Sequence, residues 1–269
     1  PEPMTMPNIT LHSLTRMKLA GDKATCVTSY DASFTQRINQ AGIDIILVGD
    51  SLGMVLQGND STLPVTMEHM VYHTQCVRAG NSQCMIMADM PFMSYRTVEQ
   101  AMTNATALMQ AGAQIVKLEG SLWLKDTVSK LYEQGIPVCA HLGLTPQAVN
   151  KLGGYRVQGK TPDQAANLLN EAIELEAAGA SIILLECVPN AVGKAITEAV
   201  NVPVIGIGAG PDTDAQVLVV YDMLGITPHK PARFVKDFLS QEGSVLGALE
   251  GYVKEVKSGQ FPAPEHCFN

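Results

Sequence analysis

The sequence predicts an α/β protein with a single (β/α)₈ barrel (a TIM barrel) and a C-terminal helical tail, and three observations predict it. An Ala-Gly pair that would end a helix recurs directly ahead of an apolar run. The runs are apolar without alternation, as in parallel strands covered on both faces. Eight such units follow one another with no low-complexity linker between them. Eight alternating units favour a closed barrel over a doubly wound sheet.

The junctions set the length of the repeating unit. They begin at Ala41, Ala111 and Ala178, so that they lie 70 and 67 residues apart. Each glycine is expected to end a helix in the left-handed conformation that other residues resist. A strand and its crossover helix take about 30 residues or more. Each interval should therefore hold two units, with the intermediate helices ending near Gly80 and Gly135.

The remaining elements follow from composition and capping. Thr97 and Thr161 each precede a glutamine by three residues and a helical apolar pattern, which predicts two capping boxes. The final strand is open to a second interpretation, because residues 216–224 also fit a helix. Residues 1–8 are expected to form a disordered lead and residues 9–269 the barrel, with a helical tail over residues 231–257. The strands are expected at 24–30, 43–49, 84–88, 114–118, 137–141, 181–186, 203–208 and 217–221.

Composition limits the class of partner. The chain of 269 residues has 18 basic and 26 acidic residues and a net charge of −8, with no Lys/Arg block, so nucleic acid is not expected. The sequence has no apolar run of about 18 residues, so a membrane span is not expected. The N-terminus does not have the pattern of a secretory signal. The six cysteines form no CxxC pair. We expect reduced thiols in a cytoplasmic protein; disulfides are the alternative.

Polar residues end several of the apolar runs. In this fold the strand ends at the C-terminal face build the active site. Carboxylates end four different runs, so they should converge, and like charges at one site would raise some of their pKa values. A hard divalent cation such as Mg²⁺ would remove that conflict, while Lys117 and His141 suit an anionic substrate. The four carboxylates are Asp50, Asp89, Glu119 and Glu186.

Each of these residues also has a structural interpretation. A lone aspartate at a strand end, such as Asp50 or Asp89, is commonly a helix cap. Lys117 and Glu119 could form a simple surface ion pair, and His141 could be a buried structural histidine. Glu186 is the most unusual, because an isolated glutamate inside an apolar run is costly unless it has a partner.

Several longer motifs resemble one family, the ketopantoate hydroxymethyltransferases. They occur in the order expected of that family and span about residues 24–239. The motifs that carry the resemblance are VGDSLGM at 48–54, STLPVT at 61–66, ADMPFMSY at 88–95, VKLEG at 116–120, HLGLTPQ at 141–147, GGY at 153–155, LECVP at 185–189 and IGIGAG at 205–210.

The resemblance implies a cytoplasmic enzyme of pantothenate biosynthesis. It would join 3-methyl-2-oxobutanoate to the one-carbon unit of 5,10-methylenetetrahydrofolate, giving 2-dehydropantoate. It implies Mg²⁺ bound through Asp50, Asp89 and Glu119. The metal would stabilise the substrate enolate, with Glu186 as the base that takes the C3 proton. Members of the family commonly form a homodecamer, so a homo-oligomer is expected. The implied substrate contacts are Asp50, Ser51, Asp89 and Lys117, to which the residue pattern adds His141.

Two positions depart from the family pattern, and two other functions compete with it. Asn59 and Tyr221 each stand where histidine is expected, which affects the expected loop closure and folate contacts rather than the reaction. The first alternative is a Mg²⁺-dependent 2-oxo-acid lyase or mutase of the isocitrate lyase type, but the Lys-Lys-Cys-Gly-His loop of those enzymes is absent from this sequence. The second is a barrel used only as a binding or scaffold subunit, in which the strand-end carboxylates would not converge.

Overall fold

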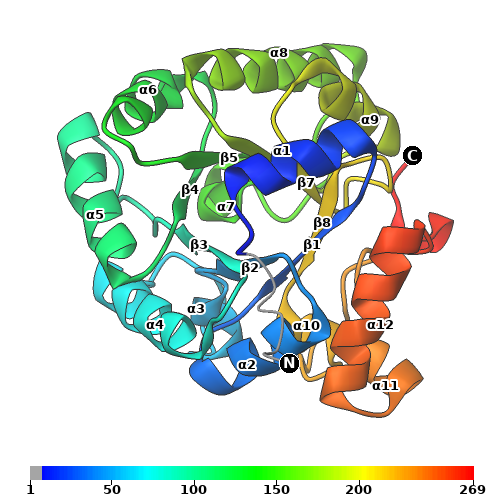
Figure 1. The fold of residues 1–269 in the computed structure, drawn as a ribbon. Coiled ribbons are helices and arrows are strands. Elements are labelled where there is room, and N and C mark those ends of the chain that lie inside the picture. Colours follow the sequence, from blue (N-terminus) through cyan, green and yellow to red (C-terminus); the bar gives the residue numbers. More distant parts are fainter. Residues whose placement is uncertain (1–7) are drawn as a thin grey trace.

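The barrel that the sequence predicts is present and closed. The computed structural model describes residues 8–269. Its eight strands are all parallel, each pairs with the next along the chain, and β8 pairs with β1 (Figure 1). The predicted disordered lead lies outside the described residues except for Asn8. The strands are β1 (Ala24–Thr28), β2 (Ile45–Val48), β3 (Met85–Asp89), β4 (Ile115–Glu119), β5 (Val138–Gly143), β6 (Ile182–Glu186), β7 (Val204–Ile207) and β8 (Ala215–Leu218).

Helices form an outer ring around the strands. Neighbouring helices of this ring contact one another in the order α12, α2, α4, α5, α6, α8 and α9. The predicted C-terminal tail thus contributes a helix to the ring, because α12 packs against α2 and β1. The ring helices are α2 (Ala32–Ala41), α4 (Met67–Gly80), α5 (Val98–Ala111), α6 (Lys125–Glu133), α8 (Pro162–Ala178), α9 (Asn190–Ala199) and α12 (Val245–Ser258).

Alternation along each strand divides the core in two. Side chains at every second position face the barrel interior, and the others face the helices. Met85 and Met87 of β3 belong to the interior cluster, so Asp89, two positions further on, continues the same inward face. The same parity turns Lys117 and Glu119 of β4 inward. The lower layers of the barrel are therefore apolar, and its last layer is polar.

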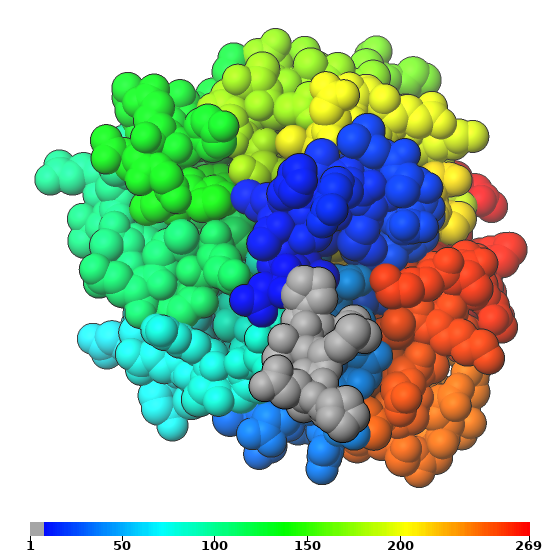
Figure 2. Space-filling view, in the orientation of Figure 1, coloured from blue at the N-terminus to red at the C-terminus, as the bar shows by residue number. Residues whose placement is uncertain are grey.

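The helix α1 (Leu11–Ala20), which the sequence analysis did not single out, fills the N-terminal end of the barrel. Leu14 is buried in the interior cluster, and Leu11 and Met17 pack against it. Lys18 fixes the helix by an ion pair of 2.9 Å with Asp214. Figure 2 shows α1 covering the middle of this face. The polar layer lies at the opposite end of the strands.

Some predicted boundaries were wrong. The eighth strand runs over Ala215–Leu218 rather than 217–221, because the helix α10 (Val220–Met223) begins inside the same apolar run. The predicted helical tail is irregular up to Asp237 and then forms two helices, α11 (Phe238–Glu242) and α12. The break between them lies at Gly243, which ends α11 in the left-handed conformation with φ 78°.

The predicted capping boxes are only half formed. Thr97 and Thr161 do cap α5 and α8, since each side chain accepts from the backbone N–H three residues on. Gln100 Oε1 accepts from the N–H of Arg96 instead of the cap residue. Of the junction glycines, Gly42 is left-handed at φ 85°, whereas Gly112 and Gly179 have wider angles of 130° and 120°. All three conformations favour glycine.

Other segments are short, and they lie mainly in loops. The short helices are α3 (Leu52–Val55), α7 (Val149–Leu152) and the 3₁₀ turns Leu122–Leu124, Pro146–Ala148 and Pro264–His266. All six cysteines lie in the described part of the chain and are free thiols. Among residues 8–269, no helix is both long and apolar enough to cross a membrane.

Candidate active site

The predicted polar residues meet at the C-terminal mouth of the barrel. Lys117 Nζ lies 2.9 Å from Asp89 Oδ1 and 3.9 Å from Glu119 Oε1. The backbone N–H of Asp50 donates to Asp89 Oδ2 over 2.8 Å, which joins the ends of β2 and β3. All four residues are buried, and Lys117 is only 4% exposed. The surface ion-pair interpretation of Lys117 and Glu119 is therefore wrong.

A second group of contacts connects Lys117 to Glu186 through His141. Lys117 Nζ lies 2.8 Å from His141 Nδ1, and His141 Nε2 lies 2.9 Å from the carbonyl of Leu144 and 3.0 Å from Glu186 Oε2. An ammonium group can only donate, so Nδ1 accepts and the ring proton is on Nε2. That proton points at Leu144 and Glu186. Both ring nitrogens of His141 thus have protein partners, and its predicted substrate contact stays a prediction.

Burial and charge shift the pKa values at the mouth. Burial raises the pKa of Glu186 to about 8. Burial, followed by repulsion from Lys117, lowers the pKa of His141 to about 4, so its contacts with Glu119 and Glu186 are not ion pairs at neutral pH. Burial opposes the charge of Lys117, but the nearby carboxylates outweigh it and raise its pKa. Glu186 is thus a carboxyl group of raised basicity within the electrostatic influence of Lys117, which suits proton abstraction.

The carboxyl groups outnumber the positive charges around them. Burial, then repulsion from Asp89 and Glu119, raises the pKa of Asp50. Burial is also the largest cause that raises the pKa of Glu119. Asp89 Oδ1 is buried and, in spite of its closeness to Lys117, has no hydrogen bond of proper geometry. One ammonium group does not balance these oxygens, so the donor set fits a hard divalent cation.

The side chains as they stand do not form a ready-made cage for such an ion. In the part of the chain from residue 8 onward, no three His, Cys, Asp or Glu side chains are grouped to hold a metal. The Lys117 ammonium lies close to both Asp89 and Glu119. Mg²⁺ commonly keeps several waters and uses only one or two carboxylates. The carboxylate oxygens are therefore of the type that Mg²⁺ prefers, but the side chains would have to rearrange around Lys117 to bind the ion.

Two residues at the mouth were missed by the sequence analysis. Gln147 donates from Nε2 to Asp50 Oδ2 and to the carbonyl of Met90, and its backbone N–H donates to Glu119 Oε2 over 2.9 Å. Tyr95 donates its hydroxyl proton to Gln147 Oε1. Both residues lie inside motifs quoted above, but an amide and a phenol give no charge pattern that would single them out.

Other predicted residues have identifiable positions. Ser51 lies at the start of α3, where its Oγ is 2.8 Å from the hydroxyl of Tyr30. Tyr221, the departure from histidine, stacks on Tyr30 with ring centroids 5.8 Å apart. Asn59 lies in the loop after α3 and bonds locally to Gln57. Neither departure touches the carboxylate cluster.

The backbone around Glu186 is specialised. Cys187, which follows it, has φ 55°, an uncommon angle for a residue with a side chain. Gly143, the strand partner of Glu186, has φ 84°, and a Cβ there would lie 2.4 Å from the carbonyl of Glu186. Such strain is typical of functional sites, where surrounding contacts hold a side chain in place.

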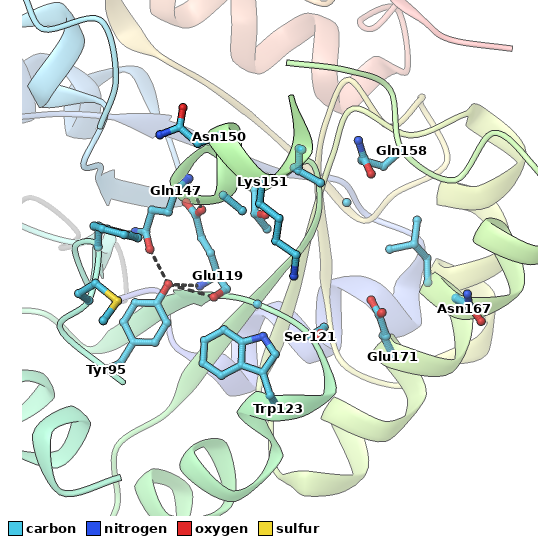
Figure 3. A pocket seen from close by; sticks show the side chains of 18 of the residues that line it. Tyr95, Glu119, Ser121, Trp123, Gln147, Asn150, Lys151, Gln158, Asn167 and Glu171 are labelled. Carbon is cyan, nitrogen blue, oxygen red and sulfur yellow. Dashed lines mark hydrogen bonds between the residues drawn. The ribbon is translucent and has the colours of Figure 1, made fainter. Parts of the chain in front are cut away.

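A large cavity opens beside the carboxylate cluster. It has a volume of about 780 Å³, and Glu119, Gln147 and Gly143 are among the residues that line it. Figure 3 shows Tyr95, Glu119 and Gln147 joined by hydrogen bonds on one side and Trp123 and Glu171 further out. Pockets of about 300–1,000 Å³ are typical of sites for drug-sized ligands.

Fold and site together define a class: a (β/α)₈-barrel enzyme with a buried acid–base centre at the C-terminal mouth. The family model described as ketopantoate hydroxymethyltransferase matches residues 8–264. The chain is 58% identical over 264 residues to 3-methyl-2-oxobutanoate hydroxymethyltransferase of Shewanella loihica, covering 98% of this chain and 100% of that one. It is 60% identical over 260 residues to the enzyme of that name from a Marinomonas species, covering 97% and 94%. The chain belongs to the ketopantoate hydroxymethyltransferase family and is a transferase.

Solved structures place the fold in a wider group. A phosphonopyruvate hydrolase is similar with a TM-score of 0.61 and 13% identity over 82% of this chain and 84% of that one. A phosphoenolpyruvate phosphomutase from Streptomyces platensis has a TM-score of 0.62 and 14% identity, with 94% and 92% covered. At this identity the similarity shows a shared barrel fold, which is also the fold of the phosphoenolpyruvate mutase type of enzyme.

Proposed function

We propose that this enzyme transfers the one-carbon unit of 5,10-methylenetetrahydrofolate to 3-methyl-2-oxobutanoate and forms 2-dehydropantoate, a step of pantothenate biosynthesis. The names of the similar proteins support the keto acid as acceptor. The observation that carries the proposal is Glu186, a carboxylate of raised pKa that faces the same mouth as three further carboxyl groups and one ammonium.

Asp50, Asp89 and Glu119 are the proposed Mg²⁺ ligands, directly or through water. When bound, Mg²⁺ would act as a Lewis acid toward the 2-oxo and carboxylate oxygens of the acceptor. A related solved structure, a phosphonopyruvate hydrolase of 13% identity and TM-score 0.60, is described as a complex with oxalate and Mg²⁺. The residues of this chain that fit the ion are those whose carboxyl groups lack sufficient counter-charge.

Glu186 is the proposed base for the C3 proton of the acceptor. The proton moves to a carboxylate oxygen of Glu186, and the C–H electron pair becomes the C2–C3 double bond of the enolate. His141 orients Glu186 through its Nε2 proton. Lys117 neutralises charge on the substrate oxygens, and Ser51 and His141 are the remaining proposed substrate contacts. The C3 carbon then bonds to the one-carbon unit as one of its two C–N bonds to the folate breaks. Water replaces the second folate nitrogen and becomes the hydroxyl group, and one proton from water together with the proton taken up by Glu186 passes to the two nitrogens of the departing tetrahydrofolate.

The test is exchange of the C3 proton for deuterium in the acceptor. Glu186→Gln should reduce the exchange rate by about 10²–10⁴-fold, the usual cost of losing a general base, while the acceptor and Mg²⁺ still bind. Glu174→Gln is a matched control, because Glu174 forms an exposed ion pair with Lys125 away from the mouth. Undiminished exchange in Glu186→Gln would remove Glu186 from this role.

Turnover with each component omitted tests the overall reaction. Product should require the acceptor, the folate donor and Mg²⁺ together. Cleavage of a carbon–carbon bond in a 2-oxo acid without folate would instead support the lyase alternative.

A further inference from the structure

The cavity beside the mouth is much larger than the acceptor substrate requires. Its volume of about 780 Å³ lies in the range of sites for drug-sized ligands, whereas 3-methyl-2-oxobutanoate has only eight non-hydrogen atoms. Its inner end reaches Glu119 and Gln147, and its outer part runs toward α8. A second and larger ligand could therefore reach the reacting carbon from this side.

One wall of the cavity is a flat aromatic surface. Trp123 lies in the turn that follows β4 and is 61% exposed. Its indole is parallel to the Tyr95 ring, with an interplanar angle of 3° and centroids 6.1 Å apart. Gly120 allows this position, because a Cβ there would lie 2.6 Å from Trp123 Cζ2. A large exposed aromatic held in place by its neighbours suits stacking with a planar ligand.

The facing wall is a polar stripe on α8. Gln164, Asn167 and Glu171 all line the cavity, and their spacing of three and four residues places them on one face of the helix. Burial raises the pKa of the Glu171 carboxyl, and no charged neighbour contributes to that shift. Figure 3 shows this carboxylate directed toward the open middle of the cavity. A ligand with adjacent N–H donors would satisfy it.

Two cations complete the lining. Arg96 and Lys151 both border the cavity, and the ion pairs found within residues 8–269 involve neither of them. Figure 3 shows the Lys151 side chain reaching into the same space from α7. These groups suit carboxylates at the far end of a long ligand.

We propose that this cavity is the subsite for the reduced folate donor, with the pterin ring against Trp123, its amino-pyrimidinone edge on Glu171, and the glutamyl carboxylates toward Lys151 and Arg96. The inference rests on the proposed function. Pterin carries a ring N–H and an amino group side by side, which match the two oxygens of a carboxylate. Gln164 and Asn167 supply further polar contacts along that edge.

The connectivity of the donor agrees with the layout of the cavity. Its one-carbon unit lies between the pterin and the aminobenzoyl ring, so the reacting carbon is in the middle of the molecule. With that carbon at the Glu119 end, the pterin extends toward α8 and the tail toward α7. Each half then meets the chemistry that suits it, namely the Glu171 carboxylate for the pterin and the Lys151 ammonium for the tail.

The test compares the KM for 5,10-methylenetetrahydrofolate with inhibition by tetrahydrofolate and by 6-methyltetrahydropterin, which has no tail. Trp123→Ala and Glu171→Gln should each raise the donor KM and both inhibition constants by about tenfold or more, while the acceptor KM changes little. Lys151→Ala should raise the inhibition constant of tetrahydrofolate but not that of the tail-less pterin. Trp123→Phe should retain most of the affinity, and Glu174→Gln on α8 is the matched control.

Unchanged donor KM values in both Trp123→Ala and Glu171→Gln would overturn the subsite. So would an equal rise in the acceptor KM, because it would indicate general damage to the mouth. Failure of the proposed function is distinguishable, since the unmodified enzyme would then not turn over with the folate donor at all.

Discussion

Gln147 donates a hydrogen bond to Asp50 over 2.9 Å, although 97 residues separate them. Gln147 follows β5 and Asp50 follows β2, so the contact connects loops from separate strands at the barrel mouth. The same glutamine contacts Glu119 through its backbone and Tyr95 through its amide oxygen. It therefore holds two proposed metal ligands in fixed orientations.

Gln147→Ala should weaken Mg²⁺ binding without removing a ligand. Loss of a group that orients metal ligands typically costs about 10–100-fold in affinity. Calorimetric titration with Mg²⁺ measures the change, and Gln134→Ala, an exposed position after α6, is the control. An unaltered Mg²⁺ affinity would show that Asp50 and Glu119 keep their orientation without this amide.

Glu186→Gln should make the metal-free protein more stable at alkaline pH. The folded-state pKa of Glu186, about 8, lies above its ordinary value of 4.5, so the fold favours the protonated form. Stability from this group is fully present below about pH 4.5 and is lost as the pH rises through 8. Glutamine avoids that loss. Urea unfolding in EDTA should show a gain of up to a few kcal/mol at pH 9 and almost none at pH 4.5; a gain independent of pH would contradict the assignment.

Lys117→Met should destabilise the metal-free protein by about 3–5 kcal/mol at neutral pH, because buried carboxylates lose their counter-charge. The pKa values of Asp50 and Glu119, already raised, would rise further. The loss should therefore grow with pH, since folding must then protonate these groups or bury their charge. Urea unfolding at pH 5 and pH 8 measures it. Equal stability of both proteins at pH 8 would mean that Lys117 does not compensate the cluster.

Gly143→Ala should destabilise the fold more than the equivalent change at Gly135. Both glycines have φ near 85°, but only at Gly143 would the new Cβ meet backbone, 2.4 Å from the carbonyl of Glu186. Gly135→Ala should cost about 1 kcal/mol for the left-handed angle alone. Thermal unfolding of the two variants measures both losses of Tm. Gly135→Ala gives the cost of the backbone angle alone, and the additional loss in Gly143→Ala gives the cost of the steric clash with β6. A similar loss of Tm in both would indicate that β6 moves freely away from residue 143.

Tyr252→Phe should weaken the seam between the first and last strands by about 1 kcal/mol. The buried hydroxyl of Tyr252 on α12 lies 2.8 Å from the carbonyl of Cys26 and 2.9 Å from that of Gln216, which belong to β1 and β8. Denaturant unfolding measures the loss, with the exposed Tyr132→Phe as reference. Hydrogen exchange of the β1 and β8 amides should increase in the variant.

The fold could be predicted because each strand carries its own local signal. Alternation within β3 and β4 places Asp89, Lys117 and Glu119 on one inward face, and parallel strands bring those faces to one end. The eighth strand was misplaced for a local reason. The apolar run at 217–220 serves two elements, because Val217 and Leu218 end β8 and Val220 begins α10.

The site could be predicted only in part. Charged residues at strand ends were visible in the sequence, and the structure brings Asp50, Asp89, Lys117, Glu119 and His141 together with Glu186. Gln147 and Tyr95 were not found, because their roles depend on which residues the loops bring near them. The contact between His141 and Glu186 likewise depends on the register of β5 against β6.

The helix α1 leaves the barrel with one entrance. Its Leu14 is buried against the strand side chains that fill the barrel interior, so within residues 8–269 the mouth is reached from the C-terminal side. When two ligands share one entrance, the ligand that binds deeper has to bind first and dissociate last. In the proposed arrangement the small acceptor at the carboxylates lies deeper than the donor in the cavity beside it, so the acceptor is expected to bind before the donor and its product to leave after the spent carrier. Product-inhibition patterns test this order of binding and release.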